Sequence, residues 1–175
     1  MTAIKHSSFR ENLALLFRAR FPVLYIESFE ESRVLGEITA VASDPALMRT
    51  VRPLYRWSAT RGFVGPDDSS QPGTTDPRAA LEWALRQTGA GVFVMLDLHA
   101  HIGDAQRPAD PRLIRTLRDV ATDFQTGNAA RVLVIVAPVL RIPSEVEKDI
   151  TIVDFPLPNE EEIRLVLDNM IAANT

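Results

Sequence analysis

The spacing of apolar positions alternates along the chain between an extended and a helical period. Short runs that are wholly apolar or that alternate with polar residues predict strands, at 23–27, 54–58, 92–96, 132–136 and 150–153. Between these runs apolar residues recur every three or four positions and predict helices, at about 7–21, 29–42, 77–87, 110–127 and 159–172. Strands that alternate with helices predict an α/β fold, a three-layer αβα sandwich around a five-stranded parallel sheet.

Local signals mark helix starts and one long loop. Residues that can cap a helix start precede four of the predicted helices, namely Ser7 or Ser8, Asp76, Asp110 and Asn159. Residues 65–77, GPDDSSQPGTTDP, carry three prolines and two glycines and predict a mobile surface loop. This loop is too short to link two cores, so we expect one domain over residues 1–175, with helix 7–21 leading in.

Composition and charge exclude several classes of protein. The net charge is −4, from 19 Lys and Arg against 23 Asp and Glu, and this argues against a nucleic-acid partner. The chain has no cysteine, which excludes disulfides and thiolate metal sites. The start lacks the apolar core of a signal peptide, and no apolar run has the length of a membrane span. We therefore expect a cytoplasmic protein that does not bind a membrane.

The turn after the first strand excludes a phosphate-binding loop. Ligands of parallel sheets bind at the carboxyl ends of strands, and here the chain reads IESFEESR. A phosphate-binding loop needs glycines and a lysine, but no glycine precedes Gly36. Glu27, Glu30 and Glu31 would repel a triphosphate from this turn. We therefore expect no cofactor for this chain alone.

The segment VFVMLDLHAHIGD places candidate ligands after the third strand. An apolar strand that ends in aspartate resembles the magnesium-holding strand of P-loop ATPases, so Asp97 is either a remnant of that position or a residue that caps the turn. In active P-loop ATPases a catalytic glutamate follows this aspartate, whereas here Leu98 stands. His99 and His101 form a weak metal pair, since both imidazoles would lie on one side of an extended segment. A third ligand at a fixed spacing is missing, so exposed or hydrogen-bonded histidines are the simpler interpretation.

Four arginines cluster around the predicted helix 110–127, namely Arg107, Arg112, Arg115 and Arg118. One interpretation is a solvated helix face that pairs with neighbouring aspartates. The other is a surface that binds an acidic protein partner.

Two families share motifs with this chain. VLYIESFEESR and VFVMLDLHAHIGD resemble the first strand and the phosphoacceptor segment of a response-regulator receiver, with Asp97 as acceptor. The flavodoxin-like order of a receiver, 2-1-3-4-5, would place strands one and three side by side. Glu27 and Asp97 would then converge in a magnesium-binding regulatory site. The resemblance fails after the fourth strand, where a receiver has Ser or Thr and this chain has Ala137.

The second resemblance covers nearly the whole chain. Its motifs, in order, are RARFPVLYIESFEESR, YRWSATRGF, AALEWALRQ, VFVMLDLHAHI and RIPSEVEKDITIVDFPLPNEEEI. They resemble the amino-terminal domain of the AAA-type ATPases of cyanobacteria, plastids and other bacteria that are named after a hypothetical chloroplast open reading frame. The resemblance implies a degenerate AAA-like domain with sheet order 5-1-4-3-2. It also implies that a complete AAA module follows, so that residues 1–175 are a fragment of a longer protein.

The same resemblance implies that this chain has lost ATPase chemistry. Residues 27–33 stand in place of the phosphate loop, Leu98 in place of the catalytic glutamate and Ala137 in place of the polar sensor, so that Asp97 alone survives. The implied function is a non-catalytic pseudo-ATPase domain that serves assembly or the recruitment of a partner or substrate. ATP and magnesium are expected only in the separate module. The implied partners are that module or the subunits of a hexamer, in the cytoplasm or, for plastid relatives, the stroma.

Overall fold

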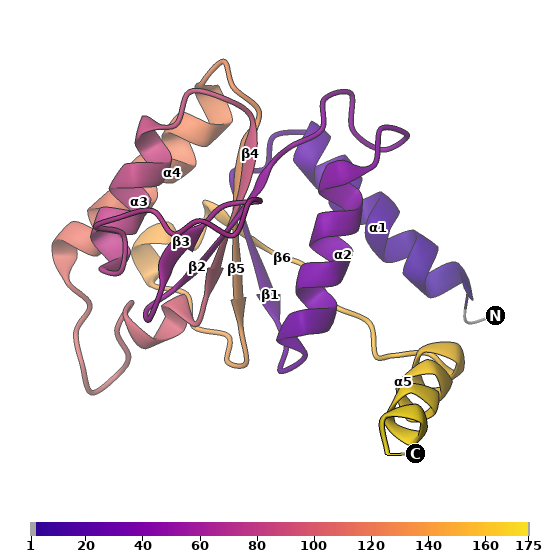
Figure 1. Cartoon of the computed structure of the whole chain (residues 1–175). Coiled ribbons are helices and arrows are strands. Elements are labelled where there is room, and N and C mark those ends of the chain that lie inside the picture. Colours follow the sequence, from indigo (N-terminus) through magenta and orange to yellow (C-terminus); the bar gives the residue numbers. More distant parts are fainter. Residues whose placement is uncertain (1–2, 175) are drawn as a thin grey trace.

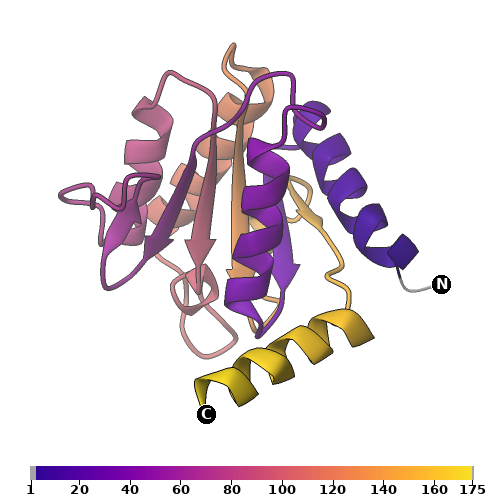
Figure 2. The same cartoon turned by 45° about the vertical axis from the view of Figure 1, so that its right-hand side comes forward.

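A six-stranded sheet with helices on both faces forms the molecule, as seen in a computed structural model that describes residues 3–174, with side chains from residue 9 onward (Figures 1 and 2). The helices are α1 (Ala3–Arg18), α2 (Glu31–Ser43), α3 (Pro77–Arg86), α4 (Pro111–Thr126) and α5 (Glu160–Ala173). The strands are β1 (Val23–Glu27), β2 (Leu54–Ser58), β3 (Gly62–Val64), β4 (Gly91–Leu96), β5 (Arg131–Ala137) and β6 (Ile150–Ile152). Two short 3-10 turns are η1 (Leu98–Ala100) and η2 (Ser144–Val146). This architecture confirms the predicted α/β sandwich.

The sheet order is β3-β2-β4-β5-β1-β6. The five predicted strands are β1, β2, β4, β5 and β6. Numbered 1 to 5 along the chain, they have the predicted AAA-like order 5-1-4-3-2. The predicted count of five was wrong, because β3 adds an antiparallel edge strand beside β2. This strand has only three residues, so its sequence carries no clear strand signal. It starts at Gly62, whose φ of 68° is typical of a turn.

The receiver alternative is wrong, and the sheet order shows why. In a receiver the first strand lies next to the strand that ends in the phosphoacceptor. Here β5 lies between β1 and β4 and pairs in parallel with both. Glu27 pairs in register with Ala137 of β5, so Glu27 and Asp97 follow strands that are not neighbours. The convergent carboxylate site expected from receiver topology is therefore not formed.

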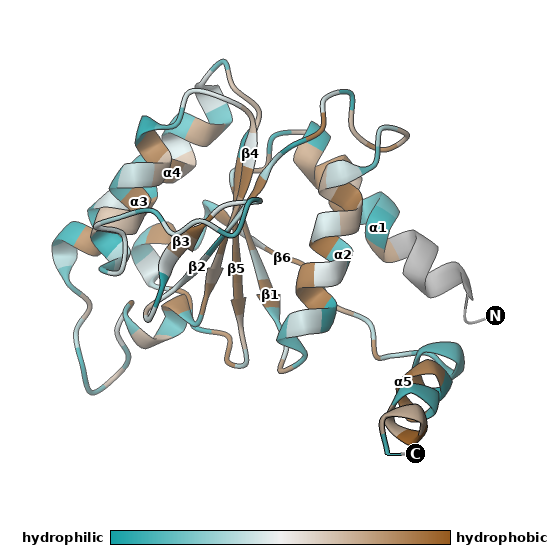
Figure 3. Cartoon of the chain, in the orientation of Figure 1, coloured by the Kyte–Doolittle hydropathy of each residue, from teal (hydrophilic) through white to brown (hydrophobic). Residues whose placement is uncertain are grey.

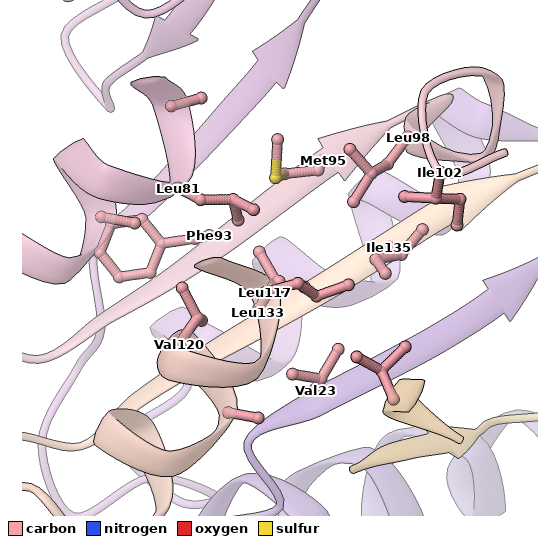
Figure 4. Close-up of a cluster of buried hydrophobic side chains, with 14 of the residues drawn as sticks. Val23, Leu81, Phe93, Met95, Leu98, Ile102, Leu117, Val120, Leu133 and Ile135 are labelled. Atoms are coloured by element: carbon pink, nitrogen blue, oxygen red, sulfur yellow. The ribbon is translucent and has the colours of Figure 1, made fainter. Parts of the chain in front are cut away.

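Alternate side chains of the inner strands point into two separate cores. Tyr25, Phe93 and Leu133 pack against α3 and α4, and part of this cluster is shown in Figure 4. Leu24 and Val94 pack on the opposite face against α1 and α2. Every residue of β4 and β5 is buried. Their continuous apolar runs predicted strands that are covered on both faces (Figure 3).

Three of the four predicted helix caps are confirmed. The carboxylates of Asp76 and Asp110 accept hydrogen bonds from the first turns of α3 and α4, and Asn159 forms a capping box with Glu162. The first helix differs, because it runs from Ala3 to Arg18 rather than from 7 to 21, and Ser7 and Ser8 lie inside it. None of the helices within residues 3–174 is long and apolar enough to cross a membrane.

The end of the loop at 65–77 is anchored to the sheet. Thr74 is buried, its carbonyl accepts a hydrogen bond from the indole of Trp57 at 2.6 Å, and its hydroxyl accepts one from the backbone N–H of Phe63 at 2.8 Å. The mobility expected for the rest of this loop stays a prediction, and so does the single-domain boundary at 1–175.

Candidate functional site

The carboxyl ends of β1, β5 and β4 are the edge where the sequence predicted chemistry. Tyr25 ties this edge to the chain that leaves β5. Its hydroxyl donates to the carbonyl of Val139 at 2.5 Å and accepts from the backbone N–H of Arg141 at 3.2 Å. Burial raises the pKa of Tyr25, and the nearby charges of Glu27 and Asp97 raise it further. Contacts with Arg141 lower the pKa of Tyr25 in part, so burial is the main cause of its shift.

Where β1 leads into α2, Arg33 in the first turn of α2 lies between Glu30 and Glu162. One terminal nitrogen of the Arg33 guanidinium, Nη2, donates to the Glu30 carboxylate at 2.6 Å and to the Pro156 carbonyl at 2.5 Å. Its other terminal nitrogen lies 3.7 Å from the carboxylate of Glu162, and the guanidinium carbon lies 4.1 Å from the centre of the Phe155 ring. These contacts fasten the start of α2 to the segment that leads into α5. The turn thus contains an internal ion-pair network where the AAA family binds phosphates.

The burial of Arg33 and its ion pairs indicate a structural role for this turn. Arg33 is only 17% exposed, and two of its guanidinium nitrogens, Nε and Nη1, are buried without a hydrogen bond. A buried guanidinium needs nearby negative charge, which Glu30 and Glu162 supply. An added phosphate would compete with both carboxylates for this one cation. The turn is therefore arranged to hold its own side chains.

Asp97 lies at the bend between β4 and η1. Its backbone is left-handed, with φ of 57° and ψ of 29°, and its N–H donates to the carbonyl of Val136. The side chain is 58% exposed and makes no capping hydrogen bond to η1. The Nδ1 atom of His99 lies 4.0 Å from the Asp97 carboxylate. The geometry does not support turn capping by the carboxylate, and magnesium holding stays a prediction.

The two histidines diverge because their segment is not extended. Residues 98–100 form the 3-10 turn η1, so the argument that His99 and His101 lie on one side was wrong. His99 faces Asp97, and its carbonyl accepts from Arg141 at 2.9 Å, whereas the ring of His101 packs edge-on against Trp57. Within the described residues no group of three potential metal ligands was found.

The predicted arginine cluster lies at the rim of a cavity of about 650 Å³. Arg115 and Arg118 of α4 line this cavity, and Arg115 also pairs with Asp119 on the same helix at 2.5 Å. Arg107 and Arg112 are exposed and lie outside its lining. Sequence reasoning missed Arg141, which reaches the cavity from the chain after β5. Acidic-partner binding at this surface stays a prediction.

The fold and this edge together define a class of protein. The sheet order with helices on both faces is that expected of an AAA-like α/β domain, and the β1–α2 turn lacks the glycine-rich phosphate loop of the active members. A family model described as "SpoVK-like AAA ATPase, N-terminal domain" matches residues 9–155, and the chain belongs to this family.

Similar proteins come from algae and share one description. The "Uncharacterized AAA domain-containing protein ycf46" of Guillardia theta is 30% identical over 159 residues, which cover 90% of this chain and 29% of that protein. The protein of the same name from Gracilaria tenuistipitata var. liui is 26% identical over 165 residues, covering 93% of this chain and 31% of the relative. The chain therefore spans less than a third of the length of these curated relatives.

Proposed function

We propose that this chain is a non-catalytic, AAA-like domain that serves assembly or the recruitment of a partner or substrate for an ATPase. One observation carries this proposal: the β1–α2 turn holds the Glu30–Arg33–Glu162 network in place of a phosphate loop. A triphosphate would have to displace Arg33 from two carboxylates and would meet Glu27 and Glu31 as well. ATP and magnesium would then bind only in a separate AAA module.

The AAA-like architecture supports a role in protein contacts. The family membership and the length of the relatives support a position beside further AAA sequence. The apolar side chains of α5 are exposed, and among the described residues this helix has none that is buried. We expect the partners to be proteins, either the separate module or the subunits of an oligomer. A cytoplasmic location stays a prediction.

A deletion in a full-length relative tests this function. In the Guillardia theta protein, the region matching residues 9–155 would be removed, and oligomer size and ATP hydrolysis would be measured side by side. We expect hydrolysis per AAA module to persist while the oligomer distribution or the captured partners change. Unchanged assembly and unchanged partners would contradict the proposal.

The isolated chain provides the catalytic half of the test. We expect it to hydrolyse no ATP above the buffer rate with magnesium present. Asp97→Asn is the matched variant, since it removes the one surviving acidic position. Hydrolysis by the wild-type chain that Asp97→Asn abolishes would show that the domain is catalytic after all.

A further inference from the structure

Four arginines meet around a second cavity, at the amino-terminal edge of the sheet. Arg18 ends α1 and Arg20 lies in the connection to β1, while Arg49 and Arg52 lie in the connection from α2 to β2. With Met48, Thr50 and Ala130 they line a cavity of about 390 Å³. This is within the size range of small-molecule sites. The strands begin at this edge, so the cavity lies opposite the β1–α2 turn (Figures 1 and 2).

No carboxylate balances these four charges. The lining contains neither Asp nor Glu, and among the described side chains none of the four arginines forms an ion pair. Other arginines of this chain do pair, such as Arg10 with Glu37 and Arg131 with Asp123. The chain as a whole is negative, so this concentration of positive charge is a local feature.

The unbalanced positive charge is least favourable at Arg52, because this residue is only 7% exposed. Its Nη2 donates to the carbonyl of Phe17 at 3.1 Å, and its guanidinium lies 5.5 Å from the centre of that ring. Burial lowers the pKa of Arg52, and the positive charge of Arg20 lowers it further. A buried cation without an anion is unfavourable, and a bound anion would offset that cost.

The other arginines are held in place and keep donors available. Arg18 donates to the carbonyl of Leu47 at 3.1 Å, and Arg20 donates to the carbonyls of Gly127 and Asn128. A guanidinium has five N–H donors, so most donors of the cluster are not used in these bonds. Arg49 makes no hydrogen bond or ion pair within the part of the chain that the structure describes.

The backbone of Arg20 belongs to the turn that ends α1. Its φ is 61°, a left-handed conformation that favours glycine, and it occupies the position after α1 where glycine is usual. The following N–H, that of Phe21, bonds back to the carbonyl of Leu16 at 3.1 Å. This helix-end turn holds Arg20 at the cavity.

We propose that this cavity binds a small anion that carries phosphate groups. Several guanidiniums can bind the several oxygens of a phosphate in bidentate geometry. One carboxylate would neutralise only one of the four arginines. The phosphate groups belong either to free pyrophosphate or to the phosphate tail of a nucleotide. This inference is separate from the proposed function, because the two sites lie at opposite edges of the sheet.

Calorimetric titration of the 175-residue chain with pyrophosphate, without magnesium and at about 150 mM NaCl, tests the site. We expect a Kd below about 1 mM, and a loss of about tenfold or more in Arg49→Gln. Arg49→Gln removes no internal bond, so the variant should fold. Arg112→Gln is the matched control, with the same charge change on α4, and should bind within about twofold of wild type.

Two further arms complete the test. Arg20→Gly relaxes the left-handed backbone and removes one guanidinium, so we expect a folded protein with weaker binding. ADP that binds more tightly than pyrophosphate would identify a nucleotide as the source of the phosphates. The proposal is overturned if the Kd for pyrophosphate is above about 1 mM, or if Arg49→Gln binds as well as wild type. It is also overturned if a short oligonucleotide displaces pyrophosphate, because the site would then be a nucleic-acid surface.

Discussion

The β1–α2 turn and the amino-edge cavity handle charge in opposite ways. In the turn, Arg33 is surrounded by the carboxylates of Glu30 and Glu162 and by the Phe155 ring. In the cavity, four arginines face one another without a carboxylate. An arginine that pairs with carboxylates of its own chain holds elements together, whereas arginines without carboxylate partners can bind an added anion. The comparison supports the proposal that the phosphate position of the AAA fold has a structural role in this chain.

The largest expected effect is on the free energy of unfolding, and it distinguishes a structural arginine from a surface one. Arg33→Met would remove the cation that lies between Glu30 and Glu162, together with its bond to the Pro156 carbonyl, so we expect a loss of about 1–3 kcal/mol in the free energy of unfolding. Arg164→Met breaks the exposed pair with Glu160 and should change it by no more than about 0.5 kcal/mol. Urea unfolding measures both. Equal effects would mean that the turn network does not stabilise the fold.

A smaller effect is expected at the buried arginine of the cavity. In buffer without phosphate, Arg52→Met should change the free energy of unfolding by less than about 1 kcal/mol, because it removes an unfavourable charge together with one hydrogen bond. Pyrophosphate at ten times its Kd should stabilise wild type by about 1.4 kcal/mol. The variant should lose most of that gain in thermal unfolding. A large loss without phosphate would assign Arg52 a structural role like that of Arg33.

Tyr25 reports the burial of the carboxyl edge. Its pKa is raised, mainly by burial, so the folded protein keeps this proton above pH 10 while the unfolded chain releases it. The stability linked to Tyr25 is thus present below the unfolded pKa and is lost as pH rises through the folded value. We expect unfolding free energy to fall above about pH 10, less steeply in Tyr25→Phe. An identical pH dependence in both proteins would contradict this assignment.

The smallest expected effect is the response to magnesium alone. Since β5 separates the strands that end in Glu27 and Asp97, millimolar magnesium should leave tryptophan fluorescence unchanged. Asp97→Asn should behave as wild type does. A magnesium response that Asp97→Asn removes would restore a regulatory metal site at this edge.

Periodicity was enough to predict most of the fold. The continuous apolar runs of β4 and β5 identified strands buried on both faces, and Asp76 and Asp110 marked helix starts correctly. β3 was missed because three residues after a turn carry no period. The interpretation of His99 and His101 failed because η1 turns a segment that was assumed to be extended.

The sites were less accessible to sequence reasoning, because tertiary structure assembles them. The missing glycines alone excluded a phosphate loop, but nothing local indicated that Arg33 pairs with residues more than a hundred positions later. The amino-edge arginines come from two connections, and only the placement of α1 and α2 on one face brings Arg18 and Arg49 together. Arg141 was missed for the same reason.

Amide NMR of the isotopically labelled chain, titrated with Mg-ATP, tests the central claim most directly. We predict that the amide signals of residues 27–33 do not shift, because their turn is closed by the Arg33 network, and that any shifts cluster at residues 18–20 and 48–52. Saturable shifts at residues 27–33 that persist in Arg49→Gln would contradict the account, since nucleotide would then bind at the AAA position without a phosphate loop.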